Sequence, residues 1–130
     1  MKLLATVILL ILFAGCATSS ESEISGAVSD YIKVAELEEQ DSIRTMGDWS
    51  HRAISQRYAT LETKKENYLV EFSRRCYELR QNEVTPDIRY EKNILRSRFD
   101  TIRGCRIGRI FAIDEGQAEE LQNLGKAPGD

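Results

Sequence analysis

The chain has 130 residues, with 18 Lys and Arg against 21 Asp and Glu, and therefore a formal net charge of −3. This length predicts one domain and excludes multi-domain enzymes of the barrel or doubly wound kind. A single histidine, two prolines and the lack of a glycine-rich loop argue against metal hydrolases, Ser-His-Asp enzymes and phosphate-loop enzymes. We therefore expect no metal, no cofactor and no catalytic residues.

The first residues have the pattern of an export signal. Met1-Lys2 give a short positive region, and the charge-free run Leu3–Ala14 is shorter than the roughly 20 residues that a spanning helix needs. Small residues then precede Cys16, as a cleavage site requires. The string Ala14-Gly15-Cys16 resembles the lipobox of bacterial lipoprotein precursors, although Phe13 stands where Leu is usual.

This resemblance implies that residues 1–15 are a signal peptide and that Cys16 carries acyl chains, palmitate among them, that attach the protein to a membrane. Two or more acyl chains give stable anchoring where one gives only marginal binding. The alternatives are an ordinary secretory signal with an incidental cysteine and a short uncleaved anchor. Ala17, not Asp, follows the cysteine, which resembles the outer-membrane sorting signal of Gram-negative lipoproteins. We therefore expect a protein anchored in the outer membrane and facing the periplasm.

The rest of the chain divides by composition. Residues 18–23 are all small or acidic and cannot pack, so they predict a tether between lipid and domain. The expected segments are a flexible tether over 16–26, a single envelope domain over 27–125 and a frayed tail over 126–130.

Two further cysteines remain, Cys76 and Cys105. An even pair in an oxidising compartment, spaced far from any CxxC metal or redox pattern, predicts a structural disulfide. Closing a loop of this length would contribute about 3.6 kcal/mol. The alternative is two unpaired buried thiols.

Charge changes sign along the chain. Residues 21–48 carry eight acidic residues against Lys33 and Arg44, whereas residues 49–109 carry fourteen basic residues against eight acidic ones. Two interpretations stay open: solvated arginines on strand faces and turns, or a surface for lipid headgroups, lipopolysaccharide or cell-wall polymers. Nucleic acid is not an expected partner in this compartment. The densest basic stretch holds Arg96, Arg98, Arg103, Arg106 and Arg109.

The first expected element of the domain is a short helix capped by Ser29 or Asp30 and extending to about Leu37. Residues 41–46 alternate weakly and end at Gly47-Asp48. The pattern over 57–73 fits either an amphipathic helix or a β-hairpin with a charged tip, and the pattern alone does not decide between them.

Later elements have clearer signals. Thr85-Pro86-Asp87 predicts a turn. The β-branched stretch 104–113 predicts a strand, and its apolar residues shift phase so that a bulge is expected near Gly108. Asp114 is expected to cap a helix over Glu115–Leu124 that ends at Gly125.

A further set of residues within 41–115 consists of Asp41-Ser42-Ile43-Arg44, Trp49, Tyr68-Leu69-Val70, Cys76, Leu79, Arg98-Phe99-Asp100, Cys105-Arg106-Ile107 and Ile110. In these residues the chain resembles a family of small Gram-negative envelope lipoproteins of unknown function. The resemblance implies a β-rich fold and favours the hairpin for 57–73, and it implies no activity. We thus expect an α+β fold: a small, mainly antiparallel sheet with a short N-terminal helix, a C-terminal helix and one disulfide.

Trp49 with Arg44 and Arg52 is the best candidate for a binding site, because an indole rimmed by guanidinium groups suits sugars or headgroups. Alternatively, Trp49 only covers the open side of the sheet. His51 lacks a second histidine or free cysteine and is expected at the surface rather than on a metal.

The function expected first is a non-catalytic binding or structural module for a protein partner or an anionic envelope component. The alternative is a hydrolase of cell-wall material. It would need two of the carboxylates Glu62, Glu66 and Glu71 to face one cleft about 5–10 Å apart.

Overall fold

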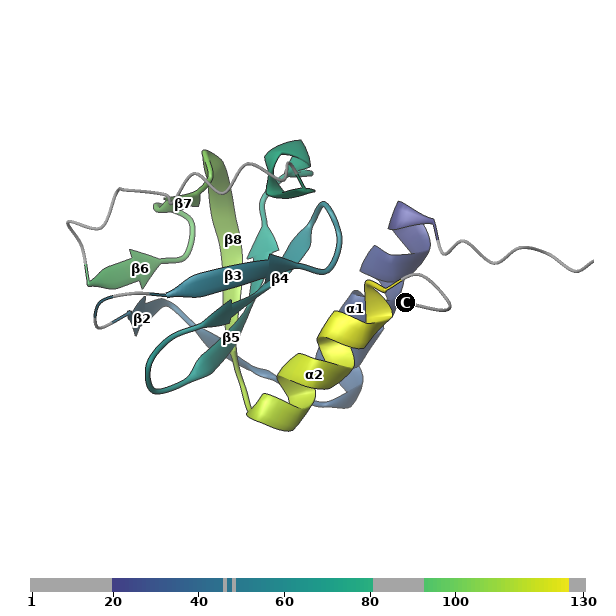
Figure 1. Ribbon diagram of the computed structural model, residues 1–130, viewed down its shortest axis with the longest axis horizontal. Helices are drawn as coiled ribbons and strands as arrows, with labels where there is room; N and C mark the ends of the chain where they lie inside the picture. Colours follow the sequence, from purple (N-terminus) through teal and green to yellow (C-terminus); the bar gives the residue numbers. More distant parts are fainter. Residues whose placement is uncertain (1–19, 46, 48, 81–92, 127–130) are drawn as a thin grey trace, which may run out of the picture.

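The computed structural model describes residues 20–45, 47, 49–80 and 93–126. This part of the chain has the expected α+β fold, with one helix near each end and strands between them (Figure 1). The elements are α1 (Glu21–Val34), β1 (Glu38–Gln40), β2 (Ser42–Arg44), β3 (Ser50–Ala53), β4 (Tyr58–Glu62), β5 (Asn67–Phe72), the 3₁₀ helix η1 (Tyr77–Arg80), β6 (Ile94–Arg96), β7 (Thr101–Ile102), β8 (Cys105–Ile113) and α2 (Glu115–Leu124).

The strands form one main antiparallel sheet and one small ribbon. The main sheet has the order β1-β8-β5-β4-β3, and β7 adds a short pairing to the start of β8. β2 and β6 pair with each other as a separate two-stranded ribbon, with Ile43 opposite Leu95. The nine-residue β8 therefore lies between β5 and β1 inside the main sheet.

The main sheet is covered on both faces. α1 and α2 lie together across one face (Figure 1), where the helix-side core contains Val28, Leu69, Phe111 and Leu121. On the other face, the ribbon-side core joins the sheet to β2, β6 and η1. It contains Ile43, Leu61, Tyr68, Val70, Phe72, Leu79, Leu95, Ile102, Ile107 and Ile110.

The hairpin expected over 57–73 is confirmed, because β4 and β5 pair in antiparallel register. Tyr68, Val70 and Phe72 share the ribbon-side core, as a period of two predicts. The C-terminal helix is also confirmed. Asp114 accepts the backbone amide of Gln117 at 2.7 Å, and the helix has its C-cap at Gly125.

The bulge expected near Gly108 is confirmed as well. Along β5 and β8, Glu71 pairs with Arg109 and the next residue, Phe72, pairs with Ile107, so Gly108 is the extra residue. A Cβ atom at Gly108 would lie 3.2 Å from the backbone oxygen of Glu71 and 3.3 Å from the nitrogen of Ser73. Only glycine lets the two backbones approach this closely without a shift.

The start predicted for the N-terminal helix, with a cap at Ser29 or Asp30, is wrong. α1 begins at Glu21, because Ser20 and Glu23 form a capping box whose N-cap, Ser20, lies nine residues before Ser29. Ile24, Val28 and Ile32 are its buried stripe. The tether expected over residues 16–26 is therefore wrong from residue 20 onward, and the domain begins before residue 27.

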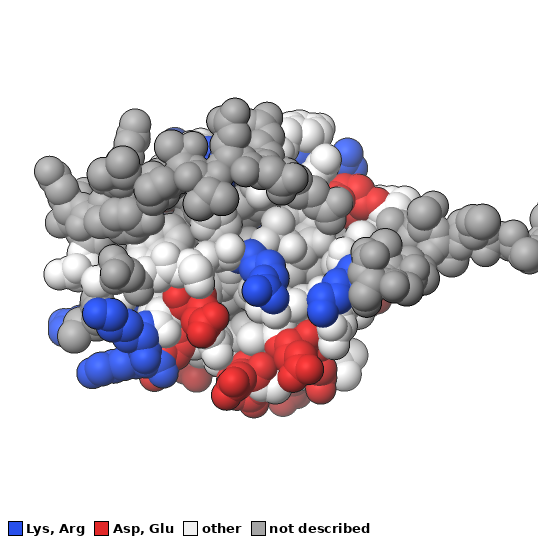
Figure 2. All heavy atoms as spheres, viewed as in Figure 1, with Lys and Arg blue, Asp and Glu red and all other residues white. Residues whose placement is uncertain are grey.

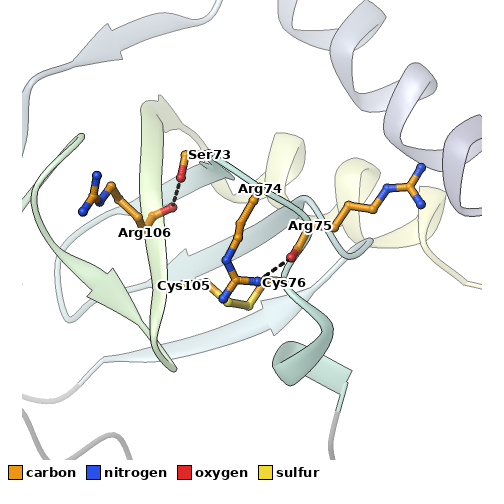
Figure 3. Close-up of a disulfide and its surroundings, with 6 residues drawn as sticks. All are labelled: Ser73, Arg74, Arg75, Cys76, Cys105 and Arg106. Carbon is orange, nitrogen blue, oxygen red and sulfur yellow. Dashed lines mark hydrogen bonds between the residues drawn. A yellow bond between two sulfur atoms is a disulfide. The ribbon is translucent and has the colours of Figure 1, made fainter.

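The expected disulfide between Cys76 and Cys105 is confirmed, with a Cα–Cα distance of 5.8 Å. It ties the segment after β5 to the first residue of β8 (Figure 3). Both cysteines are fully buried. Beside it, Ser73 Oγ donates a hydrogen bond to the backbone oxygen of Arg106 at 3.3 Å. The bond and this contact fix the chain leaving β5 against β8.

Some expectations concern residues outside the described part: the signal peptide over 1–15, Cys16, the turn at 85–87 and the end of the frayed tail. Within the part that is described, neither helix is long and apolar enough to cross a membrane.

Reduction of the disulfide is expected to lower the melting temperature by at least about 10 °C for a domain of this size. The bond closes a loop with a sequence separation of 29, and chain entropy puts its contribution at about 3.6 kcal/mol. Thermal unfolding with and without reductant measures the shift. Alkylation of both thiols in the unreduced, unfolded protein would contradict the bond.

Gly125→Ala is expected to destabilise the domain by about 1–3 kcal/mol, since a Cβ there collides with backbone. It would lie 2.4 Å from the carbonyl oxygen of Ile54 and 2.9 Å from its Cα. Gly26→Ala is the matched control: nothing lies within 4 Å of its Cβ position in α1, so helix propensity should add up to about 1 kcal/mol. Equal denaturation midpoints for Gly125→Ala and the unmodified chain would mean that α2 does not end against the β3–β4 turn.

Candidate binding surface

Trp49 lies just before β3 and is half-buried. Its ring packs against the ribbon-side core. Ala53, which follows His51 by two residues in β3, packs against the same core. The ring centroids of Trp49 and His51 are 6.1 Å apart with an interplanar angle of 53°. Trp49 thus covers part of the sheet, which is the alternative considered for it in the sequence analysis.

Arg52 belongs to the helix side of the molecule instead. Its Nη1 donates a hydrogen bond to Gln122 Oε1 of α2 at 3.2 Å. Gln122 in turn donates through Nε2 to Thr60 Oγ1 at 3.0 Å, so the three residues connect β3, α2 and β4. Arg52 therefore does not rim the indole of Trp49.

Arg44 lies on β2 and lines a groove between the ribbon and the β4–β5 turn. The lining of this hairpin groove, of about 430 Å³, includes neither Trp49 nor Arg52. The three residues of the candidate site are thus not brought together. The groove is lined by Gln40, Ser42, Ile43, Arg44, Thr63, Lys65, Glu66, Tyr68 and Ala112.

A hydroxyl and a carboxylate are fixed inside the hairpin groove. Tyr68 Oη donates to Glu66 Oε2 at 2.8 Å. Burial, followed by this hydrogen bond and the charge of Glu66, raises the pKa of Tyr68 to about 12. The Tyr68 hydroxyl therefore stays protonated at neutral pH and its hydrogen is directed toward Glu66.

The outer face of the β2–β6 ribbon was not expected from the sequence. Its register places Ser42 opposite Arg96 and Arg44 opposite Ile94, and all four side chains are exposed. Just beyond β6, Arg98 and Phe99 are exposed in the turn to β7. The ribbon has no local signal in the sequence, because each of its strands has only three residues and pairs with a strand about fifty residues away.

Glu71 forms the strongest polar cluster on the helix side of the sheet. It accepts hydrogen bonds from Arg109 Nε at 2.9 Å and Nη2 at 2.8 Å, and from Tyr58 Oη at 2.6 Å. Arg109 also lies over the ring of Phe111, 5.0 Å from its centroid. Arg109 is therefore held by Glu71 and Phe111 and is not one of the merely solvated arginines that one interpretation of the basic stretch expects.

These contacts set the pKa values of the cluster. Burial raises the pKa of Glu71, but the hydrogen bonds from Arg109 and Tyr58 and the positive charges of Arg109 and Arg57 outweigh it, so that it lies below the ordinary value of 4.5. Burial, and then the hydrogen bond to Glu71, raises the pKa of Tyr58 to about 12. Glu71 is therefore an ionised, neutralised carboxylate rather than an acid able to donate a proton.

The other carboxylates do not converge with Glu71. Glu62 pairs with Asn67 on the neighbouring strand, and Glu71 follows Asn67 by four positions, which is about 13 Å along the backbone of β5. This exceeds the spacing that either glycosidase mechanism requires. Glu66 lies at the hairpin tip, bonded to Tyr68. Among the described residues, no group of three His, Cys, Asp or Glu could hold a metal ion.

Charge is distributed unevenly over the molecule. α1 and α2 together contain six acidic residues and one basic residue, Lys33. Figure 2 shows acidic side chains gathered over α2 and a group of basic side chains at the end that carries β2 and the β4–β5 turn, with further basic side chains over the middle of this face. This end of the molecule is therefore the place to ask whether the basic residues are merely solvated or form a surface for an anionic ligand.

Glu71→Gln is expected to lower the stability at neutral pH by about 1 kcal/mol, a modest value because Arg109 is exposed to solvent over 39% of its side chain. The folded pKa of Glu71 lies below its ordinary value, so its contribution is complete above about pH 4.5 and is lost as the pH falls through the folded pKa. Urea denaturation across this range should show the difference from the unmodified chain shrinking in acid.

Glu62→Gln is the control for that series, because Glu62 is an exposed carboxylate of the same hairpin with no ion pair to any described residue. Its stability difference should be near zero at neutral pH. A Glu71→Gln difference that grew as the pH fell would contradict the assigned pKa direction.

Comparison with known proteins gives a family but no characterised relative. No curated protein and no solved structure matches the chain. A family model described as a family of unknown function (DUF6491) matches residues 1–127. The match extends well beyond the residues 41–115 on which the resemblance rested. The chain therefore belongs to the DUF6491 family of unknown function.

Proposed function

We propose that the protein is a lipid-anchored module of the cell envelope, attached to the outer membrane through acyl chains on Cys16 and facing the periplasm. The observation that carries the proposal is the apolar, charge-free run that ends in Ala14-Gly15-Cys16. Ala17 after the cysteine supports the outer membrane rather than retention at the inner one.

The disulfide supports an extracytoplasmic location. Structural disulfides persist in oxidising compartments such as the periplasm and are rare in the cytosol. The bond between Cys76 and Cys105 is buried within the ribbon-side core, where it is part of the fold rather than an exposed redox pair.

The distance from the anchor to the domain would be short. Ser20, the N-cap of α1, follows Cys16 by four positions, and four residue steps span at most about 14 Å. An acylated Cys16 would therefore hold the start of α1 close to the membrane surface.

We propose a binding or structural role rather than catalysis. The separation of Glu62 from Glu71 and the neutralisation of Glu71 by Arg109 argue against the paired carboxylates of a cell-wall hydrolase. No observation favours that alternative over a binding module.

Cys16→Ala is expected to abolish acylation and to leave the precursor unprocessed, because the thiol that would carry the thioether is gone. Growth with a labelled fatty acid, followed by mass spectrometry of the purified protein, measures both effects. Thr18→Ala is the control, since it changes a neighbouring residue and keeps the thiol. Labelled fatty acid in the Cys16→Ala protein would overturn the proposed anchor.

A further inference from the structure

Two depressions adjoin at one end of the molecule and share Ser42 of β2. One is the hairpin groove of about 430 Å³, which Arg44, Lys65 and Tyr68 line. The other, of about 310 Å³, lies at the β6–β7 turn and is lined by Asp41, Ser42, Arg96, Ser97, Arg98 and Phe99. Because Ser42 lines both, the outer face of the β2–β6 ribbon joins them into one continuous surface, called here the ribbon-end surface.

Cationic side chains outnumber the carboxylates on this surface, where Arg44, Lys65, Arg96 and Arg98 stand against Asp41 and Glu66. Arg44 and Arg96 project from the same face of the ribbon at diagonal positions of its register, which brings their Cβ atoms to within about 8 Å. Lys65 and Arg98 lie on either side of them. None of the four forms an ion pair with a described residue. Like charges so close together repel each other, and an anionic ligand would relieve this repulsion.

An exposed aromatic ring stands beside these cations. Phe99 is exposed over 77% of its surface and Ile94, on the ribbon, over 38%. The backbone that presents Phe99 is held in place: the amide of Arg98 donates to Ile107 at 2.7 Å, and the amide of Arg96 donates to the Asp100 carboxylate at 2.7 Å. The turn that carries the ring is therefore held by hydrogen bonds on the residues before Phe99, and the exposed ring is available to a ligand.

The ribbon-end surface lies far from the start of α1. Figure 1 places the ribbon at one end of the long axis and the entry of α1 toward the other. If Cys16 anchors the protein, which is the proposed function on which this argument rests, the surface faces away from the anchoring bilayer. This position favours an anionic partner other than the lipid that holds the protein.

We propose that the ribbon-end surface binds an extended acidic glycan. Carboxylate or phosphate groups along the chain would meet Arg44, Lys65, Arg96 and Arg98, with the guanidinium groups suited to planar, two-point contacts. The apolar face of a sugar ring would lie on Phe99, and the side chains of Gln40, Ser42 and Thr63 offer hydrogen bonds to sugar hydroxyls. The two depressions accommodate successive residues of a linear polymer.

The test measures binding of the full chain, purified in a neutral detergent, to polygalacturonate, a linear polymer with one carboxylate on each sugar. Arg44→Gln/Arg96→Gln is expected to weaken binding at least about tenfold, because two charge-assisted contacts are lost. Phe99→Ala should weaken it about fivefold through loss of the ring contact. Both substitutions lie at exposed positions, and unchanged melting temperatures show that they fold.

Lys33→Gln/Arg57→Gln is the matched control, since it removes the same net charge from exposed residues outside the ribbon-end surface. It should change the affinity less than about twofold at moderate salt. Equal weakening by the control and the ribbon variant would show a general charge effect and overturn the site.

Three comparisons identify the ligand class. Neutral dextran should not bind, and poly-glutamate of equal charge should bind more weakly than polygalacturonate. Equal or tighter binding of poly-glutamate would assign the surface to an acidic polypeptide and overturn the glycan proposal. Displacement of polygalacturonate by micelles doped with phosphatidylglycerol would assign it to lipid headgroups and overturn the proposal too. Acylation of Cys16, scored by mass in the same preparation, tests the anchor separately.

Discussion

The single extra residue in β8 sets the arrangement of both cores. Before Gly108, Ile107 faces the ribbon-side core, and after it Ile110 faces that same core while Phe111 turns to the helices. Without the bulge, the period of two would place Arg109 and Phe111 on the face of Ile107. The bulge therefore delivers Arg109 to the helix side, where it meets Glu71 and Tyr58. The bulge at Gly108 thus places the Arg109–Glu71 ion pair on the helix side of the sheet and keeps Ile110 in the ribbon-side core.

The disulfide fixes the start of β8, the strand that contains the bulge. β8 starts at Cys105, and the bond to Cys76 fastens that start to the segment leaving β5. Beyond Cys76, η1 adds Leu79 to the ribbon-side core. The elements that cover that face, β2, β6 and η1, are each only three or four residues long, so a covalent constraint on the unfolded chain adds to the stability that their burial provides. The side of the sheet without α-helices is thus the side that has the bond.

Local patterns were enough for the bulge and α2, because each depends on neighbouring residues such as Asp114 with Gln117. Over residues 57–73 the pattern fitted a helix as well as a hairpin, and only the family resemblance favoured the β4–β5 hairpin that the structure has. The start of α1 also had a local signal, the Ser20-x-x-Glu23 box followed by Ile24, but its polar composition was interpreted as a tether. The ribbon could not be found this way. Arg44 and Arg96 share a face only because two short strands pair across about fifty residues, and Arg52 leaves Trp49 because its partner, Gln122, lies in α2.

The segregation of charge in the sequence becomes a segregation in space. The acidic stretches near the two ends of the chain supply α1 and α2 on one side of the sheet, and the basic middle supplies β6 of the ribbon and the β4–β5 turn. An asymmetry of this kind orients an approaching polyanion before contact, since the helices repel it while the ribbon attracts it. Pairing Arg109 with Glu71 neutralises one cation in the middle of the molecule, whereas Arg44, Lys65, Arg96 and Arg98 at the ribbon end form no ion pair with a described residue. The same bulge that organises the core thereby sharpens the charge contrast on which the proposed glycan surface depends.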